Sequence, residues 1–126
     1  MKIATIVARY LLGVLFVVFG LNGFFNFIPA TTLPPMATQF FTLLLTSHFM
    51  VPIFLLELAS GILFLSNRYV PLALTLIGPV IVNILLFHIT MDPPGIAPGA
   101  VATICWLIVF ASVRPAFAGI FRQHSQ

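Results

Sequence analysis

The sequence predicts an all-α fold: a polytopic membrane four-helix bundle with the N-terminus and the C-terminus both on the cytoplasmic side. Of the 126 residues, 61% are hydrophobic and only 6% are charged. A soluble domain carries about a quarter charged residues, because its surface faces water. The mean hydropathy of +1.20 also excludes a disordered chain, since disorder requires low hydrophobicity and high charge. A backbone in lipid must satisfy its own hydrogen bonds, so the spans are predicted to be helices.

The few charged residues leave long uncharged stretches between them. None lies between Arg9 and Glu57, between Arg68 and Asp92, or between Asp92 and Arg114. The last two stretches are each about one span long, because a helix needs roughly 20 apolar residues to cross a hydrocarbon core of about 30 Å. We expect one transmembrane domain over residues 1–126.

The first span is predicted over residues 3–27. Its basic start resembles a signal peptide, but the apolar run is longer than a signal h-region and the following residues make a poor cleavage site. We therefore expect a retained helix. Pro29, Pro34 and Pro35 follow it and predict a loop, because proline denies a helix its N–H group. Residues 36–46 are too short to span and predict an interfacial helix on the outer face.

Three further spans are predicted after this short helix, over residues 49–65, 70–91 and 96–120. Pro79 lies inside the third span and predicts a kink, because it cannot donate the usual hydrogen bond to the carbonyl of Thr75. The prolines and glycine of residues 92–95 predict the end of that helix.

The basic residues predict the orientation of the bundle. With four spans, one side of the membrane receives all five Lys and Arg residues, and the other side receives Asp92. Because cytoplasmic segments carry the excess of Lys and Arg, both ends are expected in the cytoplasm. The five cations of that side are Lys2, Arg9, Arg68, Arg114 and Arg122.

Glu57 is the main candidate for a functional residue, because it interrupts an apolar helix. An unpaired carboxylate in hydrocarbon is costly, so Glu57 is expected to be either protonated or paired. Arg9 is the only plausible cationic partner inside the bundle, and small residues beside both favour close packing of the two helices. Arg9 and Glu57 thus form either a buried ion pair that fixes helix packing or a site for a ligand, proton or quinone.

A second group of polar residues is predicted towards the outer side. His88 and Asn83 lie in the outer half of the third span, and Asn22 and Asn26 lie one turn apart near the end of the first. His88 is a possible contact for a quinone, a pigment or a haem. Packing and hydrogen bonding between helices are the alternative for all four residues.

Several chemical signatures are missing from the sequence. There is one cysteine, Cys105, so the chain has no pair for thiol relay, and no phosphate-binding glycine loop, nucleophile triad or metal-ligand spacing is present. The basic residues are scattered singly, so no nucleic-acid partner is expected. No catalytic or metal-ligating residue is therefore predicted.

Five short motifs stand out along the chain, at residues 8–13, 19–24, 57–63, 67–73 and 79–88. In content and order they resemble the motifs of the DoxX-like family of small four-helix membrane proteins. The resemblance implies a compact bundle in the bacterial inner membrane, and bacterial members look like partners of membrane oxidoreductases. It favours a non-catalytic accessory subunit that contacts lipid and other membrane-protein subunits. The alternatives are an assembly factor or chaperone for membrane proteins, and a small quinone- or proton-linked enzyme or transporter centred on Glu57.

Overall fold

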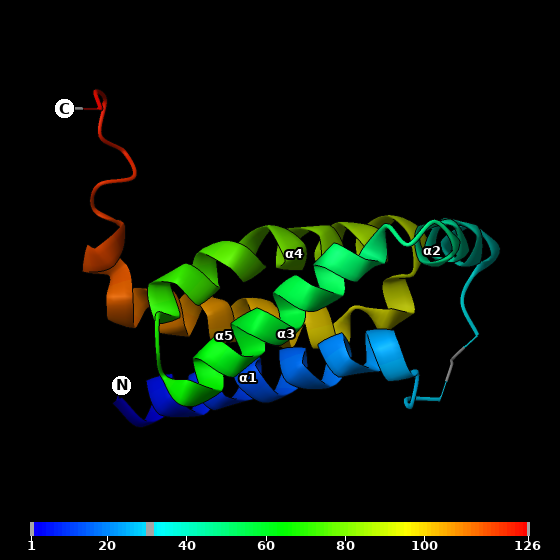
Figure 1. Ribbon diagram of the computed structural model, residues 1–126, viewed down its shortest axis with the longest axis horizontal. Coiled ribbons are helices and arrows are strands. Elements are labelled where there is room, and N and C mark those ends of the chain that lie inside the picture. The colour runs from blue at the N-terminus through cyan, green and yellow to red at the C-terminus, as the bar shows by residue number, and fades with distance from the viewer. Residues whose placement is uncertain (1, 30–31, 126) are drawn as a thin grey trace.

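A computed structural model describes residues 2–29 and 32–125, and this part of the chain folds into helices joined by short loops, without strands (Figure 1). The all-α prediction is confirmed. The elements, in chain order, are α1 (Lys2–Phe25), α2 (Pro35–Thr46), α3 (Met50–Ser66), α4 (Val70–Met91), the 3₁₀ turn η1 (Pro93–Gly95), α5 (Ala97–Val113) and the 3₁₀ turn η2 (Arg114–Phe117).

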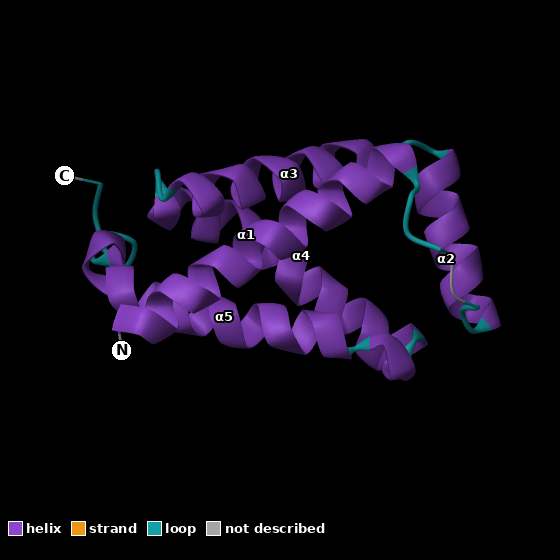
Figure 2. Ribbon diagram, turned by 90° about the horizontal axis from the view of Figure 1, so that it is seen from below, coloured by secondary structure: helices purple, strands orange, loops and turns teal. Residues whose placement is uncertain are grey.

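Four of the helices run along the long axis of the molecule, and α2 lies across one end of them (Figures 1 and 2). Both chain termini lie at the opposite end (Figure 1). The axis of α2 is bent by 87° from that of α3. This end of the bundle therefore carries a crosswise helix, and the other end carries the termini and the turn between α3 and α4.

Three helices are long and apolar enough to cross a bilayer by themselves: α1, α4 and the continuous segment Ala97–Phe117. A fourth crossing is available if the bent pair α2 and α3 is counted as one span. The reason α3 does not qualify alone is its length, since 17 residues reach about 25 Å at 1.5 Å per residue. The chain is thus a multi-pass membrane protein by length and composition, with three to four spans.

The helix boundaries follow local backbone chemistry. Helix α1 ends two residues before the predicted position, because the side-chain oxygen of Asn22 accepts a hydrogen bond from the backbone N–H of Ile28 at 2.7 Å and Asn26 adopts a left-handed φ of 51°. Helix α4 has the predicted bounds. Helix α5 ends at Val113 rather than at residue 120, because Pro115 lacks the N–H that would continue it.

Glycines bring α1 and α3 into close contact. A Cβ atom at residue 61 would lie 2.7 Å from the backbone nitrogen of Val17, and one at residue 20 would lie 2.9 Å from the backbone nitrogen of Leu58. Such distances are too short for real Cβ atoms, so only glycine fits at these two positions. The two helices therefore touch backbone to backbone, as small residues allow in membranes.

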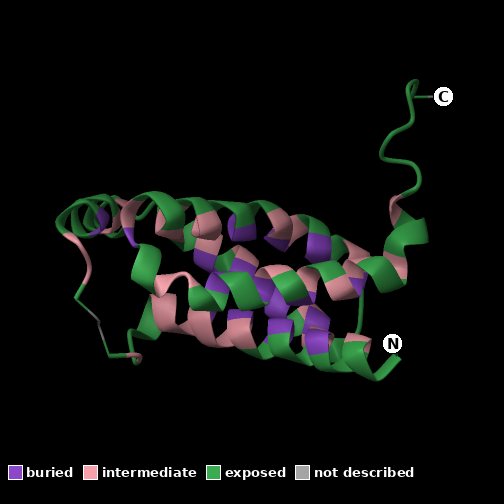
Figure 3. Ribbon diagram, turned by 180° about the vertical axis from the view of Figure 1, so that it is seen from behind, coloured by how far each residue is buried: buried purple, intermediate pink, exposed green. Residues whose placement is uncertain are grey.

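The buried residues face the middle of the four long helices, and α2 is exposed along most of its length (Figure 3). The fully buried centre includes Leu12, Phe16, Phe64, Leu74 and Ile77. By contrast, large apolar side chains are exposed on each of the five α-helices, among them Ile3, Met36, Leu55, Val82 and Ile104. An apolar outer surface of this kind suits contact with lipid or with other membrane helices.

Candidate functional site

Two polar side chains point into the apolar bundle from α3 without hydrogen-bond partners. Glu57 is 5% exposed and Ser60 is fully buried. Among the described residues, the Oγ atom of Ser60 has no hydrogen-bond partner, and the carboxyl group of Glu57 forms neither a hydrogen bond nor an ion pair. Because the two residues are three apart, they lie on the same face of the helix. Buried polar groups are normally satisfied, so this pair is the main candidate site.

Arg9 does not pair with Glu57, contrary to the ion pair expected from the sequence. Its guanidinium donates a hydrogen bond to the backbone carbonyl of Phe64 and lies 4.6 Å from the centre of the Tyr10 ring. Phe64 is seven residues beyond Glu57 on α3, which is about 10 Å along the helix.

The stagger between α1 and α3 explains why the ion pair is absent. The close contact of Gly20 with Leu58 places Glu57 near the level of Gly20. Gly20 is eleven residues beyond Arg9, so about 16 Å along α1 separates the two levels. An arginine side chain does not cover that distance. Whether Arg9 or Glu57 contacts a ligand remains a prediction.

His88 lies at the other end of the bundle from Arg9, and its ring is held within its own helix. The Nδ1 atom is 2.8 Å from the carbonyl oxygen of Ile84, and the Nε2 atom is 3.8 Å from a carboxylate oxygen of Asp92. A Cβ atom at Gly95 would lie 2.6 Å from that carboxylate and 3.0 Å from the ring. Gly95 therefore lets the 3₁₀ turn η1 pass directly beside the His88–Asp92 pair.

The other predicted site residues are likewise bonded to nearby backbone. The amide nitrogen of Asn83 donates a hydrogen bond to the backbone carbonyl of Pro79 at 2.8 Å. Asn22 and Asn26 shape the end of α1, as described above. Among the described residues, no hydrogen bond joins these side chains to His88. These polar residues therefore contact the backbone near their own position in the chain and do not form a shared polar cluster with His88.

The sequence did not indicate the roles of three residues that lie beside, or bond to, other residues of interest in the structure. Ser60 lies on the same face of α3 as Glu57, and Asp92 lies 3.8 Å from His88. Trp106 donates a hydrogen bond of 3.0 Å to the carbonyl of Leu74 across the α4–α5 contact. The spacing of three and of four residues would have indicated the first two pairs. Nothing in the sequence indicates the partner of Trp106, since it comes from a different helix.

No group of three or more His, Cys, Asp or Glu residues able to hold a metal ion occurs within residues 2–29 and 32–125. Comparisons of this chain with protein-family models, with curated proteins and with solved structures found no match. The DoxX-like family therefore remains an expectation from the motifs.

Proposed function

We propose that this chain is a non-catalytic accessory subunit of an oxidoreductase or electron-transfer complex in a bacterial inner membrane. Its resemblance to the DoxX-like family supports the link to an oxidoreductase. The excess of basic residues at the end that carries both termini supports a cytoplasmic location for that end. The observation that carries the proposal is a polar position on the outward face of α4.

Asn83 is an exposed amide in the interior of a membrane-spanning helix. It lies eight residues before the end of α4, which is about 12 Å from that end. One side-chain N–H of Asn83 donates to the backbone carbonyl of Pro79. The side-chain oxygen of Asn83 has no hydrogen-bond partner among the described residues. Polar groups of this kind are costly in hydrocarbon and bond across helix interfaces.

Pro79 adds to the polar character of this face, because it leaves a backbone carbonyl of α4 without its usual donor. Pro79 is itself exposed, and it cannot donate to the carbonyl of Thr75. Around these groups the surface is apolar, with Val82 and Leu86 more than half exposed. An apolar helix face with one amide at its centre suits a helix of another subunit that carries a matching donor or acceptor.

The test is the isolation of the full chain from its native membranes in a mild detergent. We expect a stoichiometric complex that contains a redox-active subunit, and we expect the substitution Asn83→Leu to reduce recovery of that complex about tenfold. A loss of one to two hydrogen bonds between helices, each about 0.6–1 kcal/mol, gives an effect of this order. The control is Leu107→Ile, because Leu107 is more than half exposed on α5 and its side chain has no polar atom. A chain recovered alone, or equal recovery with both variants, would contradict the proposal.

The buried pair Glu57 and Ser60 favours a second candidate function, a small quinone- or proton-linked enzyme or transporter. A bound substrate or a transferred proton would supply the partner that both side chains lack. In that case Glu57→Gln abolishes activity while the protein still folds, whereas an accessory subunit with this substitution keeps its complex intact.

A further inference from the structure

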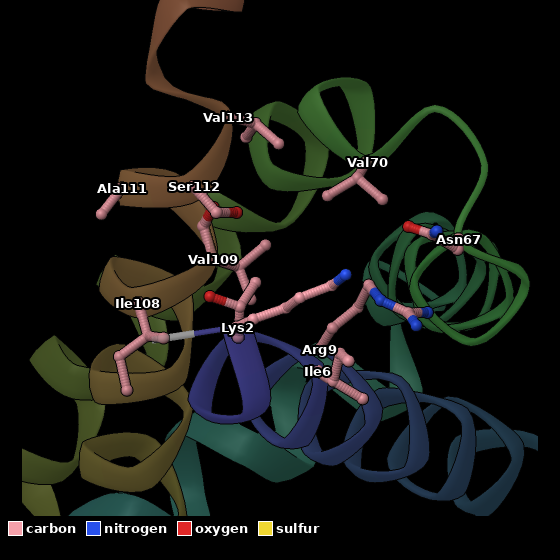
Figure 4. Close-up of a pocket in the computed structure, with 11 residues that line it drawn as sticks. Lys2, Ile6, Arg9, Asn67, Val70, Ile108, Val109, Ala111, Ser112 and Val113 are labelled. Carbon is pink, nitrogen blue, oxygen red and sulfur yellow. The ribbon is translucent and has the colours of Figure 1, made fainter.

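A basic cavity opens at the end of the bundle that carries both termini. Its volume is about 680 Å³, and it lies between the start of α1, the turn between α3 and α4, and the end of α5. Figure 4 shows the side chains of Lys2 and Arg9 extending from α1 into the same space, with Asn67 facing them from the turn. The polar residues that line it are Lys2, Thr5, Arg9, Asn67 and Ser112.

No acidic residue balances the two cations of this cavity. The chain has two acidic residues, and neither lines the cavity: Asp92 follows α4 at the opposite end of the bundle, and Glu57 lies about 16 Å deeper than Arg9. Among the described residues, Lys2 forms no hydrogen bond or ion pair. Arg9 uses one N–H group for the carbonyl of Phe64, which leaves most of its five donors available. The cavity therefore offers donors and positive charge to an anion.

The rest of the cavity is apolar, and an apolar groove lies next to it. The wall of the basic cavity is completed by six apolar residues, which are Ile6, Val70, Ile108, Val109, Ala111 and Val113. A groove of about 470 Å³ follows the contact between α1 and α5 and is lined by Ala4, Val7, Ala8, Leu11, Val101, Ile104, Cys105 and Ile108. Ile108 borders both spaces. An anion that enters the cavity thus has hydrocarbon-compatible surface directly beside it.

We propose that this end of the bundle is a binding site for an anionic phospholipid, with its phosphate held between Lys2 and Arg9 and an acyl chain in the α1–α5 groove. Lys2 and Arg9 are seven residues apart on α1, so they cover about 10 Å of depth, which spans the headgroup region of one leaflet and the adjoining edge of the hydrocarbon core. Basic pockets between membrane helices bind anionic headgroups in this way. A dissolved phosphate shares the headgroup chemistry, but it makes no use of the groove.

Native mass spectrometry of the full chain tests the site. The protein is purified in a neutral detergent and titrated with phosphatidylglycerol or with phosphatidylcholine of the same acyl chains. We expect one phosphatidylglycerol per chain, bound at least tenfold more tightly than phosphatidylcholine. We expect Lys2→Gln and Arg9→Gln each to weaken it about fivefold, since one basic residue near a membrane surface contributes about 1 kcal/mol.

The matched control is Arg114→Gln, which removes the same charge from the same end of the bundle but from outside the cavity. Equal weakening by Arg114→Gln and Lys2→Gln would overturn the proposal in favour of general surface charge. Arg9→Gln loses the hydrogen bond to Phe64, and this variant could fail to fold. In that case Lys2→Gln still tests the phospholipid site, since Lys2 is exposed and bonded to no described residue.

A third variant distinguishes a lipid from a soluble anion. Ala4→Trp fills the α1–α5 groove, and Ala4 does not line the basic cavity. We expect this variant to weaken phosphatidylglycerol binding, and we expect inorganic phosphate to compete poorly with the lipid in the unsubstituted chain. Unchanged lipid binding by Ala4→Trp, or complete competition by an equal concentration of inorganic phosphate, would show that the site takes a phosphate rather than a phospholipid.

Discussion

Helices α1 and α3 touch through their backbones, whereas α4 and α5 are joined by a large side chain. At the first contact, Gly20 and Gly61 leave no room for a Cβ atom. At the second, Trp106 lies against Gly78, with 3.7 Å between its ring and the position of a Cβ atom there, and donates to the carbonyl of Leu74. Its ring also stacks on Phe110 at 5.1 Å.

This difference between the two helix contacts determines which of them can adjust to a substitution. Two backbones in contact cannot move apart without losing many van der Waals contacts at once, but a side chain can adopt a different rotamer. The α1–α3 contact thus fixes the stagger of the two helices, including the separation of Arg9 from Glu57. The α4–α5 contact instead depends on the side chain of Trp106.

The largest expected effect is that of Gly61→Ala. The added methyl group would lie 2.7 Å from the backbone nitrogen of Val17, and we expect the free energy of unfolding to fall by about 1–3 kcal/mol, as is usual for overpacking. Unfolding by sodium dodecyl sulfate in mixed micelles measures it. The control is Gly78→Ala, which has space beside Trp106 and gains helix propensity of up to about 1 kcal/mol. Equal losses for both variants would mean that the two contacts do not differ.

An intermediate effect of opposite sign is expected for Glu57→Met. Methionine has a similar length and no polar atom that needs a hydrogen bond, so removal of a buried and unpartnered carboxyl group should raise the free energy of unfolding by about 1–2 kcal/mol. The same micelle titration measures the change. A loss of stability would instead indicate that Glu57 has a bound partner, and it would favour the second candidate function.

The smallest expected effect is that of Trp106→Phe. This substitution keeps an aromatic ring but removes the hydrogen bond to Leu74, and we expect a loss of about 0.5–1 kcal/mol, the usual value between membrane helices. Repeating it together with Pro79→Ala tests whether the hydrogen bond of Trp106 depends on Pro79. Additive effects of the two substitutions would show that Trp106 acts independently of Pro79.

The sequence predicts single helices better than it predicts the contacts between them. The bounds of α4 were correct because its start and end are marked by residues that act locally, such as Pro71 in its first turn and the prolines after Asp92. The ion pair between Arg9 and Glu57, one of two alternatives drawn from the sequence, does not form in the structure, because the positions of two residues on separate helices contain no information on how those helices are staggered. That stagger depends on Gly20 and Gly61, whose partners lie on a different helix.

The unequal lengths of the long helices have a consequence for the surrounding membrane. Helix α3 has 17 residues and α4 has 22, so their lengths are about 25 Å and 33 Å. Helix α2 lies crosswise where α3 begins, and it therefore does not extend α3 along the long axis of the bundle. Lipid beside α3 meets a shorter apolar surface than lipid beside α4, and mismatch of this size costs fractions of a kcal/mol per Å. The bundle should thus thin the bilayer on one flank and favour thinner membranes.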